Sequence, residues 1–285
     1  MWNLLGRSRG SRCIVVVALV LLGSGGFSPV QALEPLVPYD NFSAKTIDPT
    51  RWVGLGPDLD VREVERVVNG KSLMLTHRAY ANTLSDTGDT GGVVGLAFWS
   101  FDVTGAQFTV AAKKVEVTDC SPSRQLETTR TGAGFRGRFF STQASGPGDQ
   151  TGDVEVAIDI SKVGGPNSGP NEFPLRVTAF YQRCDNATCG ARTTLAFHEL
   201  GAIGLGDETI LTVQWDQANH QFIFKRDLVS QVVSPYTVSD IHPSSIRGGL
   251  LGLGRVVANC TTSPRPTVYV EATFKKVLVN LSAAP

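Results

Sequence analysis

The chain has 285 residues, and its 26 basic and 26 acidic side chains give a formal net charge of zero. Hydrophobic residues make up 41% of the sequence, which is enough for one large core. A near-neutral chain without a basic stripe argues against nucleic acid or an anionic membrane surface as the main partner.

The first 32 residues have the pattern of a cleaved secretory signal. Arg7, Arg9 and Arg12 form a basic region, residues 13–22 are an apolar run that is short for a membrane span, and small residues end at Ala32. We expect cleavage after Ala32; the alternative is an uncleaved anchor helix.

The chain after this leader is predicted to be one exported domain, residues 33–285. The leader holds three of the 26 basic residues and none of the acidic ones, so the remaining 253 residues have a net charge of −3. They contain no second apolar run of membrane-spanning length. The sequence therefore predicts a secreted or periplasmic protein with no membrane span after cleavage.

Four cysteines remain in the exported domain, and an even number in an exported chain favours two disulfides with three possible connectivities. Cys184 and Cys189 bracket a four-residue turn between two strand-like runs, a spacing that suits a disulfide at the mouth of a hairpin. We therefore pair Cys184 with Cys189 and, by elimination, Cys120 with Cys260. A metal site would need closer ligands and a nearby histidine, so neither a metal nor a cofactor is expected.

Nearly every readable segment alternates apolar and polar residues, and Gly, Pro, Asn and Asp clusters interrupt it at short intervals. Asn69-Gly70 predicts a tight hairpin, and residues 81–92 and the glycine-dense stretch 248–254 are not expected to be strands. No helical pattern or fixed-period repeat is found. The prediction is an all-β, antiparallel, two-sheet sandwich with strands at residues 61–68, 71–80, 93–101, 108–117, 135–140, 153–160, 175–182, 192–200, 209–215, 220–226 and 267–279.

The segment 153–160 has the clearest two-faced pattern. Its even positions are aliphatic and predict a core face, whereas Asp153, Glu155 and Asp159 lie on the other face with Ala157 between them. Arg136 and Arg138 share one face of the strand 135–140.

Several segments together resemble the concanavalin A-like lectin and glucanase jelly roll of secreted bacterial proteins, over residues 38–280. The resemblance is carried by Asp40-x-Phe42, Ile47-Asp48, Trp52, the Asn69-Gly70 hairpin, the hairpin from residues 212–215 to Phe224, and the last strand, 268–279. It implies that the first and last strands pair, and that a concave sheet containing residues 135–140 and 153–160 carries a ligand groove. The glucanase branch has a further acid where this chain has Ala157.

The predicted ligand-binding residues are Arg136, Arg138, Asp153, Glu155 and Tyr181, with Tyr181 offering a ring for a sugar to stack on. We expect non-catalytic binding of a glycan or another extracellular ligand. One alternative is a glycoside hydrolase or lyase that uses Asp153 and Glu155, which are about 6.6 Å apart along the strand. A second alternative is a polar face neutralised by the arginines, and a third is a structural module that interacts through its edge strands.

Overall fold

The computed structural model describes residues 33–54, 61–81, 89–120, 129–164, 174–228, 230–259 and 265–285. These residues belong to one unit, which runs from Ala32 to Pro285. The expected leader, residues 1–32, and Cys260 lie outside the described residues.

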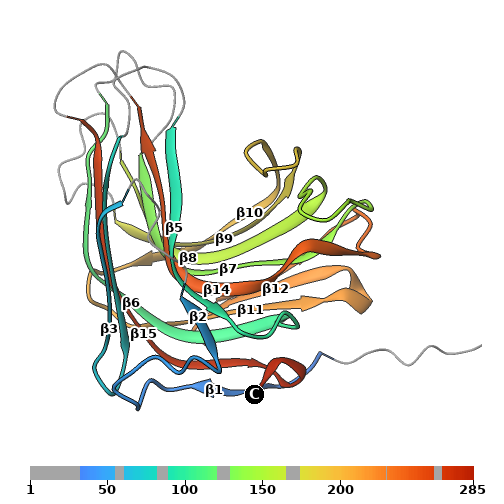
Figure 1. Cartoon of the computed structure of the whole chain (residues 1–285), viewed down its shortest axis with the longest axis horizontal. Helices are drawn as coiled ribbons and strands as arrows, with labels where there is room; N and C mark the ends of the chain where they lie inside the picture. Colours follow the sequence, from blue (N-terminus) through green and yellow to red (C-terminus); the bar gives the residue numbers. More distant parts are fainter. Residues whose placement is uncertain are drawn as a thin grey trace, which may run out of the picture. The chain divides into compact units, whose positions relative to one another are not determined.

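The described strands form two antiparallel sheets, which confirms the predicted all-β sandwich (Figure 1). No helix among the described residues is long and apolar enough to span a membrane. The eight-stranded sheet has the order β13 (Ser230–Pro235), β12 (Gln221–Arg226), β11 (Thr209–Asp216), β6 (Gly105–Val117), β15 (Thr267–Asn280), β4 (Leu73–Tyr80) and β3 (Val61–Val68), with β1 (Leu36–Asp40) paired to β15. The seven-stranded sheet has the order β10 (Arg192–Ile203), β9 (Leu175–Cys184), β8 (Asp153–Val163), β7 (Arg130–Ser141), β14 (His242–Ala258), β5 (Asp89–Phe98) and β2 (Trp52–Gly54).

The core lies between the two sheets, and period-two alternation explains which side chains reach it. On β8 the predicted aliphatic face is buried, and it packs with aromatic rings such as Phe135 on β7 and Phe222 on β12. The polar face of β8 therefore points away from this core, although Asp153, Glu155 and Asp159 on it are themselves buried.

The first and last strands pair as the resemblance implies, with Leu36 opposite Asn280 and Val37 opposite Val279. After Asp40 the chain leaves this sheet. Trp52 begins β2 in the other sheet and pairs with Phe98, so the stretch from Asp40 to Trp52 crosses from one sheet to the other. The Trp52 ring packs 4.8 Å from that of Phe98, and its Nε1 donates to Asp40 at 2.6 Å.

The main differences from the predicted strands involve glycine and turn residues. The stretch 248–254 lies inside β14, and β13 was not predicted. The β3–β4 hairpin has a four-residue loop, because Val68 pairs with Leu73; Gly70 in this loop has a φ of +82°. β5 begins at Asp89 and ends at Phe98.

Glycines allow β14 to lie unusually close to its neighbours. A Cβ on Gly252 would lie 2.6 Å from the carbonyl oxygen of Val94, and one on Gly95 would lie 2.2 Å from that of Leu251. The glycine-dense stretch is thus a strand, and at Gly252 it has no room for a side chain.

Candidate functional site

The outer face of the seven-stranded sheet is its concave face (Figure 1). Strand register sets the neighbours on it: Arg138 lies opposite Glu155, and Glu155 lies opposite Gln182. Two residues further along these strands, Arg136 lies opposite Ala157. The predicted placement of residues 135–140 and 153–160 in one sheet is therefore observed, with their polar positions side by side.

Glu155 is the centre of this group. Its carboxylate accepts a 2.8 Å hydrogen bond from Nε2 of Gln182. Nη1 of Arg136 lies 3.8 Å from one carboxylate oxygen, and Nη2 of Arg138 lies 3.7 Å from the other. We call Arg136, Arg138, Glu155 and Gln182 the arginine cluster.

The environment of Glu155 keeps its carboxyl ionised. Burial raises the pKa of this carboxyl, since only 9% of the side chain is exposed. The charges of Arg136, Arg192 and Arg138 outweigh burial, and the pKa lies below its ordinary value. Glu155 is thus suited to hold the guanidinium groups in place, and it is poorly suited to donate a proton.

Asp159 is separated from Glu155 by Ala157 and has a different environment. Its carboxylate accepts a 2.8 Å hydrogen bond from the Thr178 hydroxyl. Burial raises its pKa, and the nearby charge of Arg136 offsets only part of that effect. The carboxylate lies above Gly132, where a Cβ would be 3.0 Å from its Oδ2.

Two of the predicted binding residues lie elsewhere. Tyr181 is on the inner face of β9, 2% exposed, with its ring 5.0 Å from that of Phe222 and its hydroxyl donating to the carbonyl of Pro235. Asp153 is 0% exposed, and its two oxygens accept hydrogen bonds from the backbone N–H and the hydroxyl of Ser245. In this structure Tyr181 is a core residue and Asp153 anchors a segment of β14, so neither is open to a ligand.

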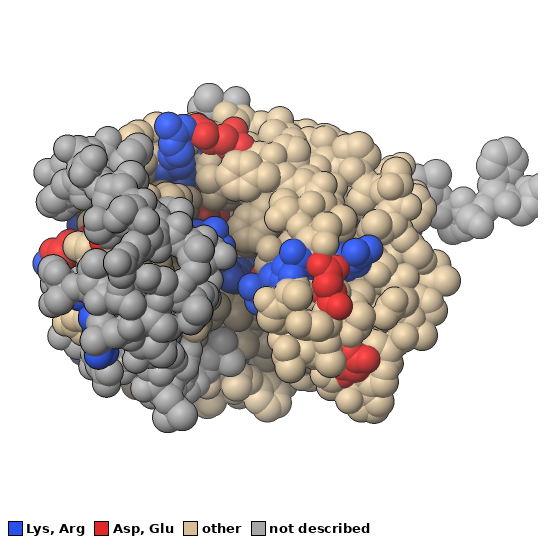
Figure 2. All heavy atoms as spheres, turned by 90° about the horizontal axis from the view of Figure 1, so that it is seen from above, with Lys and Arg blue, Asp and Glu red and all other residues tan. Residues whose placement is uncertain are grey.

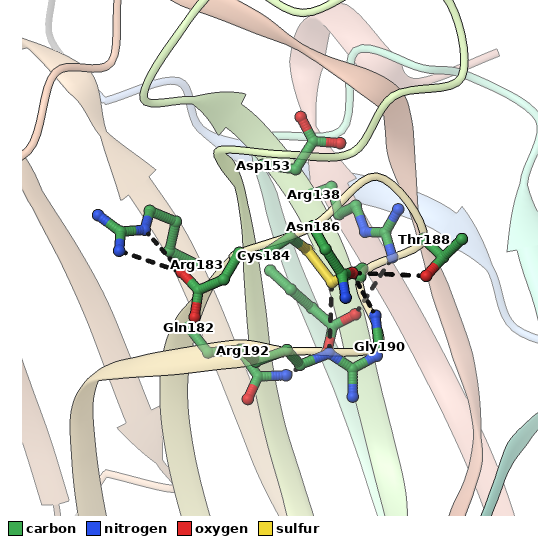
Figure 3. Close-up of a disulfide and its surroundings, with 12 residues drawn as sticks. Arg138, Asp153, Gln182, Arg183, Cys184, Asn186, Thr188, Gly190 and Arg192 are labelled. Carbon is green, nitrogen blue, oxygen red and sulfur yellow. Dashed lines mark hydrogen bonds and ion pairs between the residues drawn. A yellow bond between two sulfur atoms is a disulfide. The ribbon is translucent and has the colours of Figure 1, made fainter.

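The predicted disulfide between Cys184 and Cys189 is confirmed, with a Cα–Cα distance of 4.7 Å. Cys120 is also disulfide-bonded; its predicted partner, Cys260, lies outside the described residues. Arg138, Gln182 and Arg192 lie around the Cys184–Cys189 bond (Figure 3). Nε of Arg192 donates to Sγ of Cys189 at 3.3 Å, so the disulfide helps to hold a third guanidinium near Glu155.

Aromatic side chains lie on both sides of the arginine cluster. Toward β10, Phe180 pairs with Phe197, whose side chain is 59% exposed. Toward β14, Gly248 lies opposite Arg138, and a Cβ there would be 3.6 Å from the ring of Phe101, which is 69% exposed. Sequence reasoning missed these phenylalanines, because only strand register and loop position bring them to the arginines.

A pocket of about 320 Å³ opens beside Arg138. Its lining includes Phe101, Ile241 and His242. Seen from above, Lys and Arg side chains gather where this face is hollowed (Figure 2). The site therefore combines positive charge, hydrogen-bond donors and exposed aromatic surface.

Comparisons with known proteins show similarity at the level of structure. No family model matches the chain, and neither does any curated protein sequence. A GlcNAcα1-4Gal-releasing endo-β-galactosidase from Clostridium perfringens is 10% identical at a TM-score of 0.41, covering 87% of this chain and 64% of that one. LamAcat from Zobellia galactanivorans is 11% identical at a TM-score of 0.41, with 88% and 99% covered. Lectin UEA-II, solved with galactose, is 8% identical at a TM-score of 0.36, with 88% and 100% covered.

Proposed function

We propose that this protein binds a glycan on the concave face of the seven-stranded sheet without catalysing a reaction on it. The arginine cluster is the observation that supports this most. It presents charged and amide groups from three adjacent strands, and a site built on strands holds its side chains more firmly than one built on loops. Sugar hydroxyls are both donors and acceptors, which suits a mixed set of guanidinium, carboxylate and amide groups.

The exposed phenylalanines give the second line of support. Phe197 and Phe101 lie at opposite sides of the cluster, and each offers a flat apolar surface to the C–H face of a sugar ring. Their burial by a ligand would remove apolar surface from water.

Binding is favoured over hydrolysis because the two carboxyls of the catalytic alternative are not arranged for acid–base chemistry. Asp153 is enclosed by its bonds to Ser245. Glu155, with its lowered pKa, has no open carboxyl beside it on the strand, since Ala157 follows on the same face. Two carboxyls flanking the scissile bond are what most glycosidases require.

The formed disulfide supports export to an oxidising compartment, and we extend the proposal to a secreted or periplasmic location. Detection of the chain in the periplasmic or extracellular fraction, cleaved after Ala32, would test this part.

A glycan array followed by calorimetry on residues 33–285 tests the binding proposal. Glu155→Gln and Gln182→Ala are expected to weaken binding at least fivefold, whereas Lys71→Gln, in the exposed β3–β4 loop on the other sheet, should not. Absence of binding to any polysaccharide would contradict the proposal. So would turnover of a glycan that Glu155→Gln abolishes, because it would reveal catalysis.

A further inference from the structure

We infer that the ligand is an acidic saccharide, carrying carboxylate or sulfate groups, and that Arg136 and Arg138 bind its anionic group. This inference rests on the proposed function and specifies its ligand class. Three guanidinium groups, those of Arg136, Arg138 and Arg192, act on the carboxylate of Glu155, and Arg136 also acts on that of Asp159, so three cations face two acidic groups. The centre of the concave face therefore keeps a surplus of positive charge.

The unused donors of these arginines are the second observation. Both ion pairs to Glu155 are longer than a hydrogen bond, at 3.8 Å and 3.7 Å. Within the described part of the chain, the carboxylate of Glu155 receives its side-chain hydrogen bond from Gln182, and neither Arg136 nor Arg138 donates one to a protein acceptor. Each guanidinium has five N–H donors in a planar fork that matches a carboxylate or a sulfate.

The partial burial of the two arginines strengthens their interaction with an anion. Their side chains are 27% and 17% exposed, so the guanidinium groups are partly removed from water. A charge in such a place interacts more strongly with an anionic partner than one on an open surface. Glu155 acts here as a positioning residue, since its charge draws the two guanidinium groups together.

The pocket beside Arg138 provides room for the sugar ring that bears the charge. Arg138 and Phe101 both line it, and its volume of about 320 Å³ is at the lower end of small-ligand sites. Asp102 and Asp240 line it as well, and the Asp240 carboxylate is already bonded to the Tyr236 hydroxyl and to His220. An anionic group on Arg138 would place the attached ring against the exposed face of Phe101. A polymer would extend along the cluster toward Phe197.

Calorimetry with matched probes tests the inference directly. We expect residues 33–285 to bind polygalacturonate or dextran sulfate at least tenfold more tightly than neutral galactan or dextran. Raising the salt concentration from 50 to 500 mM should weaken that binding severalfold, because ion pairs are screened. This comparison needs no variant, so it remains decisive if a substitution disturbs folding.

Variants then assign the effect to the arginines. Arg136→Gln and Arg138→Gln should each lower affinity for the acidic probe at least tenfold, and Arg138→Lys should restore only part of it because lysine lacks the fork. Lys71→Gln is the matched control for loss of one positive charge elsewhere.

Each outcome has a distinct meaning. Equal affinity for acidic and neutral glycans would overturn the inference and leave the proposed function standing. Binding to no glycan would overturn both. Equal or tighter binding of a DNA duplex of the same charge would show attraction to any polyanion, and it too would overturn the inference.

Discussion

The hydroxyl of Ser245 donates a 2.7 Å hydrogen bond to Oδ2 of Asp153, and the backbone N–H of Ser245 donates to Oδ1 at 3.0 Å. The two residues are 92 positions apart in the sequence, and the carboxylate is fully buried. Asp153 therefore fixes the start of β14 against the start of β8.

We predict that Asp153→Ala lowers the free energy of unfolding by about 3 kcal/mol, because it leaves a buried N–H and hydroxyl without their charged acceptor. Ser245→Ala, which removes only the hydroxyl, should cost about 1 kcal/mol. Urea denaturation of the single and double variants gives the coupling energy between the two side chains. Additive losses would show that the two residues do not depend on each other.

The buried His77 should make the free energy of unfolding depend on pH. It lies fully buried on β4, where burial and the charge of Arg255 lower its pKa to about 3. The unfolded chain binds a proton at His77 below about pH 6.5 and the folded chain does not, so the free energy of unfolding falls as the pH drops from about 6.5 toward 3. Between pH 7 and 4.5 we expect a loss of about 2–3 kcal/mol from this group.

The measurement compares thermal or urea unfolding of the unmodified chain and His77→Gln across that pH range. The variant should lose less stability on acidification, since its side chain does not titrate. His242→Gln, which changes a histidine at the surface pocket, is the matched control for the loss of one imidazole. Parallel profiles for the unmodified chain and His77→Gln would contradict the assignment.

A substitution at Gly134 would test how closely β7 and β8 approach each other at the site. A Cβ there would lie 2.1 Å from the carbonyl oxygen of Ile158 and 2.6 Å from Cα of Asp159, both backbone atoms. We predict that Gly134→Ala costs about 3 kcal/mol or more, because the β7–β8 pair must separate. Gly146→Ala, with nothing within 4 Å of the added carbon, should change stability by less than about 0.5 kcal/mol. Similar unfolding midpoints in urea for the two variants would refute this prediction.

Replacing both Cys184 and Cys189 by serine should have two effects. The free energy of unfolding should fall by about 2 kcal/mol, which is the loop-entropy contribution of so short a disulfide loop. Affinity for an acidic glycan should also fall, because Arg192 loses the sulfur to which its Nε donates. Urea denaturation and calorimetry measure the two effects separately. Unchanged affinity would mean that Arg192 is held without the disulfide.

The alternation of apolar and polar residues was sufficient to predict most of the fold. It indicated the aliphatic face of β8 and the presence of Arg136, Arg138 and Glu155 on outward faces, and the cysteine spacing indicated the disulfide between β9 and β10. The same alternation assigns Tyr181 to the face of Val177 and Ala179, both buried, so its core position was readable from the sequence.

Other parts of the site depend on contacts between distant segments. Nothing near Asp153 indicates that Ser245 will cover it. The positions of Gln182 and Arg192 near Glu155 depend on the register of three strands, and local sequence patterns do not determine that register. The glycine-dense sequence of β14 is typical of a loop. Its role in a strand becomes clear only from the pairing of Gly252 with Gly95 on β5 and Gly134 on β7.

The pairing of β1 with β15 extends into a direct link between the two ends of the described domain. The carboxylate of Glu34 accepts a 2.8 Å hydrogen bond from the backbone N–H of Ser282. A short linker could therefore join residue 285 to residue 33, and new ends could be opened at the 146–148 turn, where glycines face open space. Such a circular permutant would keep every strand pair described in both sheets and would move the chain ends to the loop between β7 and β8.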